Sequence, residues 1–274
     1  MTAELISIKS LWGMPEPLET QFQRIYDAGY RGIECPLPDS GKRSEFKELL
    51  HQYGFVYVAQ IFADDSKSFE DQVQKAAELN PLLINSQSAK DSMPFDRQLD
   101  FFRRAVDVEK GFGLPVAHET HRGRAMYSPW TTERLLNEIE DLKLTADFSH
   151  WVCVCESLLE EHAECLELAA GRTIHVHTRT GHAQGPQVPD PRDPVWLKEH
   201  DAHLKWWRSI FTLHQREGTD LTFTPEYGPP GYMPTVPFTQ DPVSDLWEIC
   251  LWKKRVIENE WTKKDLLEEQ EQKQ

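Results

Sequence analysis

The chain has 274 residues, of which 39% are hydrophobic and 27% are charged, and its formal net charge at pH 7 is -15. This composition is typical of a globular protein, and no run of about 20 apolar residues is present that would span a membrane. An acidic surface repels phosphate backbones, which argues against nucleic-acid binding.

The N-terminus and the cysteines indicate a compartment. The first residues, MTAELISIKSLWG, lack the basic region and apolar run of a secretion signal. The five cysteines are odd in number and irregularly spaced, so we expect reduced thiols in a cytoplasmic protein. Cys153 and Cys155 have no second pair to complete a zinc site, and we interpret them as small interior hydrophobic residues.

Short apolar runs alternate with longer amphipathic segments along the chain. The predicted strands are Leu5–Ile8, Gly32–Cys35, Phe55–Ile61, Leu82–Ser86, Val116–Glu119, Leu144–Phe148, Arg172–His177 and Leu221–Glu226. The predicted helices are Pro17–Ala28, Arg43–Tyr53, Ser68–Leu79, Pro94–Phe112, Thr131–Leu142, Ser157–Ala170, Trp196–Glu217 and Val243–Glu260. Ser68 is expected to cap the third of these helices.

Eight strand–helix units in a chain of this length predict an α/β fold, a single (β/α)8 TIM barrel. The strands are mostly apolar on both faces, as parallel strands covered by helices are. A doubly wound open sheet is the alternative, but no G-x-G-x-x-G follows the first strand. No low-complexity linker divides the chain, so we expect one domain over residues 1–274, with 261–274 as a polar C-terminal tail.

The seventh predicted strand carries two histidines before a long loop. Its β-branched residues Thr173, Ile174 and Val176 favour a strand. Side chains alternate along a strand, so His175 and His177 point to the same side, about 6.6 Å apart. Neutral imidazole is a common metal ligand, although two hydrogen-bonded interior histidines would give the same pattern.

In a barrel of parallel strands, reactive groups gather at the carboxyl ends of the strands. The ends of the last four predicted strands carry Glu119, Asp147, His177 and Glu226. Three carboxylates and one imidazole suit one divalent ion, Mn²⁺ or Mg²⁺, and tolerate Co²⁺ or Zn²⁺. An acid at a strand end equally suits the cap of the next helix, and Asp147 fits that alternative best.

Four motifs resemble the xylose-isomerase-like TIM-barrel superfamily, the sugar isomerase and epimerase group that includes the ketose 3-epimerases. They are HETHRGR at His118–Arg124, D-x-x-H at Asp147–His150, H-V-H at His175–His177 and P-E-Y-G-P at Pro225–Pro229. The resemblance covers most of the chain, from about Leu5 to Glu260. It implies that Glu119, Asp147, His177 and Glu226 bind one divalent metal ion and that His150 faces the substrate.

The resemblance also implies a reaction, metal-dependent epimerisation or isomerisation of a sugar or polyol. A proton next to the carbonyl is removed, and the resulting enediolate is stabilised by the dication. Glu119 and Glu226 are the implied acid/base pair, and His150 the donor to a substrate hydroxyl. The family's epimerases carry a substrate arginine six residues past the metal histidine. Here Ala183 takes that position, so either Arg179 replaces the arginine or the substrate differs.

Further substrate contacts are expected around the mouth of the barrel. Arg122 and Arg124 flank Glu119 and suit an anionic group, although Arg124 is expected to pair with a surface acid. His182 lies in the long loop that follows the seventh strand.

Trp12 is placed to stack on a sugar face, and Gln60 would line the cup from an early strand end. Other early strand ends carry Lys9, Glu34, Asn85 and Gln87. The proline-rich segment Gly228–Val236 is interpreted either as a rim with Tyr232 pointing inward or as an ordinary surface connection.

Three alternative functions are considered. An inosose-type dehydratase begins with the same proton abstraction, and a non-catalytic sugar-binding barrel would be favoured if Glu119 or Glu226 were replaced. A DNA-repair endonuclease with three zinc ions needs histidines from the early strands, and only His51 precedes His118. We expect a small-molecule substrate and, because oligomers are common in the family, a homo-dimer or homo-tetramer.

Overall fold

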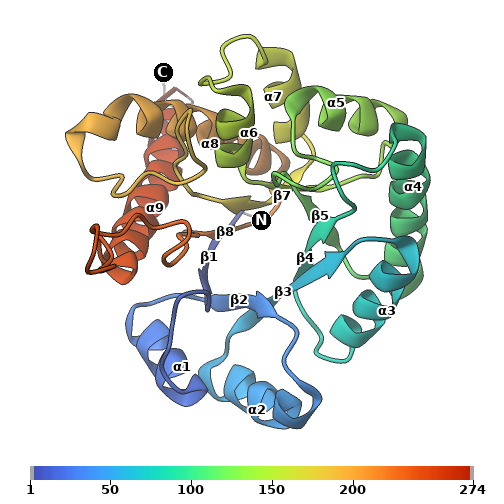
Figure 1. Ribbon diagram of the computed structural model, residues 1–274, viewed down its shortest axis with the longest axis horizontal. Coiled ribbons are helices and arrows are strands. Elements are labelled where there is room, and N and C mark those ends of the chain that lie inside the picture. The colour runs from blue at the N-terminus through green and yellow to red at the C-terminus, as the bar shows by residue number, and fades with distance from the viewer. Residues whose placement is uncertain (1–2, 272–274) are drawn as a thin grey trace.

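The computed structural model describes residues 3–271, and the side chains among them as far as residue 263. Eight parallel strands close into a barrel in the order β1 to β8 (Figure 1). The strands are β1 Leu5–Ser10, β2 Gly32–Pro36, β3 Val56–Ala63, β4 Leu83–Ser88, β5 Val116–Glu119, β6 Leu144–Ala146, β7 Thr173–His177 and β8 Leu221–Thr224. This arrangement confirms the predicted (β/α)8 barrel.

Helices surround the barrel (Figure 1). The α-helices are α1 Leu18–Asp27, α2 Arg43–Tyr53, α3 Ser66–Ala77, α4 Phe95–Phe112, α5 Pro129–Glu138, α6 Phe148–Cys155, α7 Ala163–Ala170, α8 Leu197–Glu217 and α9 Leu246–Glu271. Single 3-10 turns, η1 Ser40–Lys42 and η2 Pro194–Trp196, precede α2 and α8. The sequence predicts the bounds of β5 and α2 correctly.

Two hydrophobic layers position the polar end of the barrel. The larger core lies between the strands and the helices. A smaller cluster fills the barrel interior with Ile6, Ile8, Val58, Leu83 and Ala117. Two residues further along their strands, on the same face, Leu83 is followed by Asn85 and Ala117 by Glu119. Buried polar side chains therefore lie directly above the apolar plug, at the carboxyl ends of the strands.

The segment after β6 differs from the prediction. The sequence predicts a strand as far as Phe148 and one helix over Ser157–Ala170, whereas β6 ends at Ala146 and two helices, α6 and α7, follow. The Asp147 carboxylate accepts a hydrogen bond from the Ser149 backbone N–H at 3.2 Å and caps α6. The apolar residues after Asp147 therefore continue as a helix, and Asp147 has the capping role considered from the sequence.

One further expectation is wrong in detail, and the expected tail continues the last helix. Asp65, and not Ser68, caps α3, because its carboxylate accepts the hydrogen bond of the Ser68 backbone N–H at 2.8 Å. The polar tail expected from residue 261 is helical as far as Glu271. Trp261 is only 7% exposed, and its ring centroid lies 5.6 Å from that of Phe211. Residues 272–274 of the expected tail lie outside the described residues.

The structure also bears on the expected reduced cysteines and on the expected lack of a membrane-spanning segment. All five cysteines are free, and Cys153 and Cys155 are half-buried, less enclosed than the sequence predicts. Among the described residues, no helix is both long and apolar enough to span a membrane.

His203 on α8 is a buried histidine that fixes the loop after β7. Its Nε2 accepts a hydrogen bond from the Gly181 backbone N–H at 3.2 Å, and its Nδ1–H donates to the Glu199 carbonyl at 2.8 Å. The rings of Trp206 and Trp207 enclose it at centroid distances of 4.8 and 5.6 Å. Burial lowers the pKa of His203 to about 4, since a charged imidazole loses its hydration there.

This lowered pKa predicts a loss of stability in acid. In the unfolded chain His203 has a pKa of about 6.5 and binds a proton below that pH, whereas in the folded protein it remains neutral. The free energy of unfolding therefore falls as pH decreases. From about pH 7.5 to about pH 5 the contribution of His203 to this fall is about 2 kcal/mol. His203→Gln should be less stable at neutral pH but show a fall smaller by that amount, measured by denaturant unfolding at both pH values.

The same experiment contains its control. Between about pH 7.5 and about pH 9 the parent and His203→Gln should change in parallel, because His203 is neutral in both states there. An equal acid fall in the two proteins would contradict the assignment.

Candidate functional site

Four side chains from successive strand ends meet in the barrel mouth. Glu119 ends β5, Asp147 follows β6, His177 ends β7 and Glu226 lies two residues past β8. One donor atom of each lies within 4.8 Å of the others. His177 Nδ1 is 3.7 Å from Glu119 Oε1, 3.7 Å from Asp147 Oδ2 and 3.3 Å from Glu226 Oε2. We call these four buried residues the carboxylate cluster.

The carboxylate cluster fits a divalent cation. Among the described residues, Glu119 Oε1 and His177 Nδ1 have no hydrogen-bond partner. A buried polar atom without a partner costs about 1–3 kcal/mol, and a cation between these atoms would remove that cost. Carboxylate oxygens and one neutral imidazole nitrogen are a donor set that accepts Mg²⁺ or Mn²⁺.

The other ring nitrogen of His177 is held by Glu34 on β2. His177 Nε2 lies 3.1 and 3.2 Å from the two carboxylate oxygens of Glu34. Glu34 also accepts hydrogen bonds from Asn85 Nδ2 at 2.8 Å and Thr224 Oγ1 at 2.6 Å. Metal-binding histidines usually donate their second N–H to such a carboxylate, which fixes the tautomer and the ring orientation. Glu34 therefore directs Nδ1 of His177 toward the three carboxylates of the cluster.

His175 is not a member of the carboxylate cluster but lies beneath it, in contact with Glu34. Its Nε2 lies 3.3 Å from Glu34 Oε2 and its Nδ1 2.7 Å from Thr222 Oγ1. His175 and His177 point to the same side as predicted, with ring centroids 5.2 Å apart. Burial alone would raise the pKa of Glu34, but the two histidines outweigh it and hold that pKa well below its usual value.

Arg179 lies inside the site. Its guanidinium is 1% exposed, pairs with Asp147, and places Nη1 3.1 Å from Glu226 Oε2. Its Nε donates to Ser149 Oγ at 3.1 Å, and Nη2 lies 2.7 Å from His150 Nε2. Burial would lower the pKa of Arg179, but Asp147 and Glu226 reverse the effect and raise it. Arg179 is thus a permanent positive charge that offsets part of the negative charge of the carboxylate cluster.

The acids of the cluster differ in pKa. Burial raises the pKa of Glu119 to about 8, with Glu226 and Asp147 adding to the rise against the effect of His177. Burial would also raise the pKa of Glu226, but His177 and Arg179 hold it below its usual value. Burial would also raise the pKa of Asp147, but the permanent charge of Arg179 outweighs it and lowers that pKa. Without a cation, Glu119 is therefore the acid that keeps its proton near neutral pH.

His150 on α6 borders the carboxylate cluster and is fully buried. Burial lowers its pKa well below the usual value, so the imidazole is neutral. Its Nε2 faces Arg179, a donor, which leaves the proton on Nδ1, and Nδ1 has no partner among the described residues. The ring of His121 lies 3.9 Å away between centroids. His150 therefore carries a buried N–H at Nδ1 that can donate a hydrogen bond.

Tyr232, in the loop after β8, lies at the rim. Its ring centroid is 5.0 Å from that of Trp12 and 6.4 Å from that of His150. The guanidinium carbons of Arg179 and Arg122 lie 5.0 and 5.2 Å from the same ring. Tyr232 therefore points inward, and Trp12 and Arg122 lie at the rim beside it.

Other predicted site residues lie apart from the carboxylate cluster. His182 is half-buried in a small turn paired with Gly185, and its ring is 4.9 Å from that of Trp196. Gln60 on β3 is half-buried, pairs in register with Asn85, and makes no described hydrogen bond to the cluster. Arg124 pairs with Asp64 at 2.8 Å, as expected for a surface arginine.

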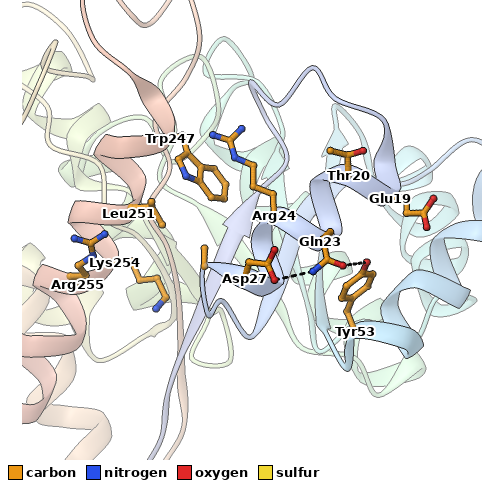
Figure 2. A pocket seen from close by; sticks show the side chains of 11 residues that line it. Glu19, Thr20, Gln23, Arg24, Asp27, Tyr53, Trp247, Leu251, Lys254 and Arg255 are labelled. Atoms are coloured by element: carbon orange, nitrogen blue, oxygen red, sulfur yellow. Dashed lines mark hydrogen bonds between the residues drawn. The ribbon is translucent and has the colours of Figure 1, made fainter.

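A groove of about 930 Å³ lies on the outside of the barrel (Figure 2). It is lined by α1, by Tyr53 of α2 and by α9, and the guanidinium carbon of Arg24 lies 3.9 Å from the ring of Trp247. Gln23 donates to Asp27 at 2.9 Å and accepts from Tyr53 at 3.0 Å (Figure 2). No member of the carboxylate cluster lines this groove, so we place the candidate site at the strand ends.

The structure resembles solved barrels. D-Allulose 3-epimerase from Methylomonas sp., in complex with D-allulose, aligns with a TM-score of 0.60 at 15% identity, over 95% of this chain and 100% of that chain. A xylose isomerase-like TIM barrel protein from Mycobacterium smegmatis, in complex with magnesium, aligns with a TM-score of 0.64 at 12% identity, over 94% and 96%. The probable 3-DHS dehydratase AsbF from Bacillus anthracis aligns with a TM-score of 0.57 at 16% identity, over 93% and 98%.

At these identities the similarities establish the fold, and in that respect they confirm the resemblance indicated by the motifs. No protein-family model matches the chain, and no curated protein matches it.

The sequence does not predict that Glu34 holds the ring of His177. The residue is visible as an acid at the end of a predicted strand, but its contact with His177 joins residues 143 positions apart. We predict that Glu34→Gln weakens Mn²⁺ binding about 10- to 100-fold, because the neutral side chain holds His177 less firmly. Calorimetric titration of the metal-free protein with Mn²⁺ measures the change.

Gln60→Ala is the matched control, since it alters a neighbouring strand of the same barrel without touching His177. It should bind Mn²⁺ as the parent does. Unchanged Mn²⁺ affinity in a folded Glu34→Gln protein would refute the role of Glu34.

Proposed function

We propose that the protein is a divalent-metal-dependent isomerase or epimerase that acts on a sugar or polyol. The observation that carries the proposal is the carboxylate cluster, in which Glu119, Asp147, His177 and Glu226 converge around two buried donor atoms without partners. All four residues would hold the metal. The fold shared with D-allulose 3-epimerase supports the assignment.

Mn²⁺ or Mg²⁺ is the proposed metal, with Co²⁺ or Zn²⁺ tolerated, because oxygen ligands predominate in the cluster. The magnesium complex of the Mycobacterium smegmatis barrel is consistent with this choice. When bound, the metal would stabilise the negative charge that develops on substrate oxygens as a proton leaves.

Glu119 and Glu226 are the proposed acid/base pair. They come from β5 and β8, which are not neighbours in the barrel, so the two carboxylates approach the cup from different sides. Removal of a proton from one face of the substrate and its return to the other require two such groups.

The neighbouring residues orient the substrate. His150 would donate from Nδ1 to a substrate hydroxyl, and the buried guanidinium of Arg179 would face substrate oxygens from the same side. Tyr232 and Trp12, whose ring centroids lie 5.0 Å apart, would shield the reacting atoms from water at the rim.

The test is solvent exchange. Mn²⁺-loaded protein in D2O with a panel of ketoses should incorporate deuterium at the carbon next to the carbonyl. Glu226→Gln should lower this rate at least about 100-fold, because one proton-transfer group is lost. Mass spectrometry of the recovered sugar measures incorporation.

Glu140→Gln removes an exposed acid far from the strand ends and serves as control. Its exchange rate should equal that of the parent. Exchange that survives complete removal of divalent metal by a chelator would refute the metal-dependent mechanism.

A dehydratase acting on a keto-polyol is the second candidate. It is favoured by the shared fold with the probable 3-DHS dehydratase AsbF, and its first step would use the same proton removal. Product mass separates the two, since a dehydratase product is lighter by one water molecule.

The cytoplasm is the proposed location, supported by the five free cysteines. A homo-dimer or homo-tetramer remains the proposed assembly, and sedimentation equilibrium would determine it.

A further inference from the structure

Arg122 differs from the other arginines near the strand ends. Arg124 pairs with Asp64 at 2.8 Å, and Arg179 pairs with Glu226 at 3.1 Å. Arg122 is exposed, and among the described residues its guanidinium lies over the ring of Tyr232 and forms no ion pair with a carboxylate. In a chain with 45 acidic and 30 basic residues, an arginine at the rim with no acidic partner retains its capacity to bind an anion.

The backbone holds Arg122 in place. The segment His121–Arg124 forms a turn closed by a hydrogen bond from the Arg124 backbone N–H to the His121 carbonyl at 3.1 Å. Gly123 in this turn has a φ of +77°, a conformation that favours glycine. The side chain of His121 adds a contact of 2.5 Å between its Nδ1 and the Arg122 carbonyl. Arg122 is therefore presented from a fixed turn just past the end of β5.

This position lies next to the proposed chemistry. The ring of His121 is 3.9 Å from that of His150, which borders the carboxylate cluster. Arg122 and Arg179 each lie about 5 Å from the ring of Tyr232, so their guanidinium carbons are at most about 10 Å apart. A small polyol that reaches the carboxylate cluster at one end would bring its other end to Arg122.

We propose that the substrate carries an anionic oxygen group, a carboxylate or a phosphate, which Arg122 binds at the rim. The inference rests on the proposed function and adds the chemical class of the substrate, a sugar acid or a sugar phosphate. The guanidinium presents paired N–H groups that match either oxyanion. A net charge of -15 repels anions in general, and a fixed cation at the mouth offsets this repulsion for such a substrate.

Three compounds that cannot undergo the reaction test binding alone. D-Glucitol, D-gluconate and D-glucitol 6-phosphate share one carbon chain and differ in the group at its end. On the Mn²⁺-loaded protein, one of the two anions should bind about 10- to 100-fold more tightly than glucitol, as a hydrogen-bonded charge pair provides. The anion that binds more tightly shows whether the substrate group is a carboxylate or a phosphate. Calorimetry or competition with a ketose in the exchange assay gives the affinities.

Variants test the residue. Arg122→Gln should abolish the preference for the anion while leaving glucitol affinity unchanged, and Arg122→Lys should retain part of it because the charge remains. Arg124→Gln, two residues away and paired with Asp64, should keep the full preference. Equal binding of all three compounds by the parent, or a full preference in Arg122→Gln, would overturn the proposal.

The binding experiment and the deuterium-exchange experiment test the anion site and the proposed function independently. Anion preference without deuterium exchange from any ketose, sugar acid or ketose phosphate would support the anion site and refute the proposed function. Exchange with neutral ketoses and no preference for either anion would support the proposed function and refute the anion site.

Discussion

The hydrogen bond between Glu34 and His177 is the contact on which the candidate site depends. It crosses the barrel interior from β2 to β7 and fixes which ring nitrogen faces the carboxylate cluster. A buried carboxylate is costly unless it is fully hydrogen-bonded. Glu34 meets this condition through His177, His175, Asn85 and Thr224, from three different strands. The apolar plug beneath keeps this polar layer at the mouth of the barrel.

Charge balance determines the rest of the site. Three carboxylates within a few ångströms would repel one another in a buried space. Arg179 offsets part of this repulsion by pairing with Asp147 and Glu226, while burial raises the pKa of Glu119. The loop that carries Arg179 is itself fixed from outside the barrel, by His203 on Gly181 and by Lys253, whose Nζ lies 3.0 Å from Thr180 Oγ1. Helices α8 and α9 thus contribute to the position of a charge in the barrel mouth.

The sequence predicts the barrel and the four members of the carboxylate cluster because both follow from local pattern. Apolar runs locate the strands, and strand ends must meet in a closed barrel. The contact of Glu34 could not be predicted in this way, since it joins residues 143 positions apart. The helix α6 was missed because Phe148–Cys155 is nearly all apolar and resembles the end of a buried strand. The path of Arg179 into the cluster depends on side-chain packing that periodicity does not report.

Asp147 combines two duties in one side chain. One carboxylate oxygen begins α6 by accepting from Ser149, while the other faces His177 and Arg179. Replacement of this residue would therefore disturb both the start of α6 and the carboxylate cluster, and loss of the proposed activity alone would not reveal which had failed. Asparagine retains a capping oxygen and removes the charge, so it is the substitution that separates the two duties.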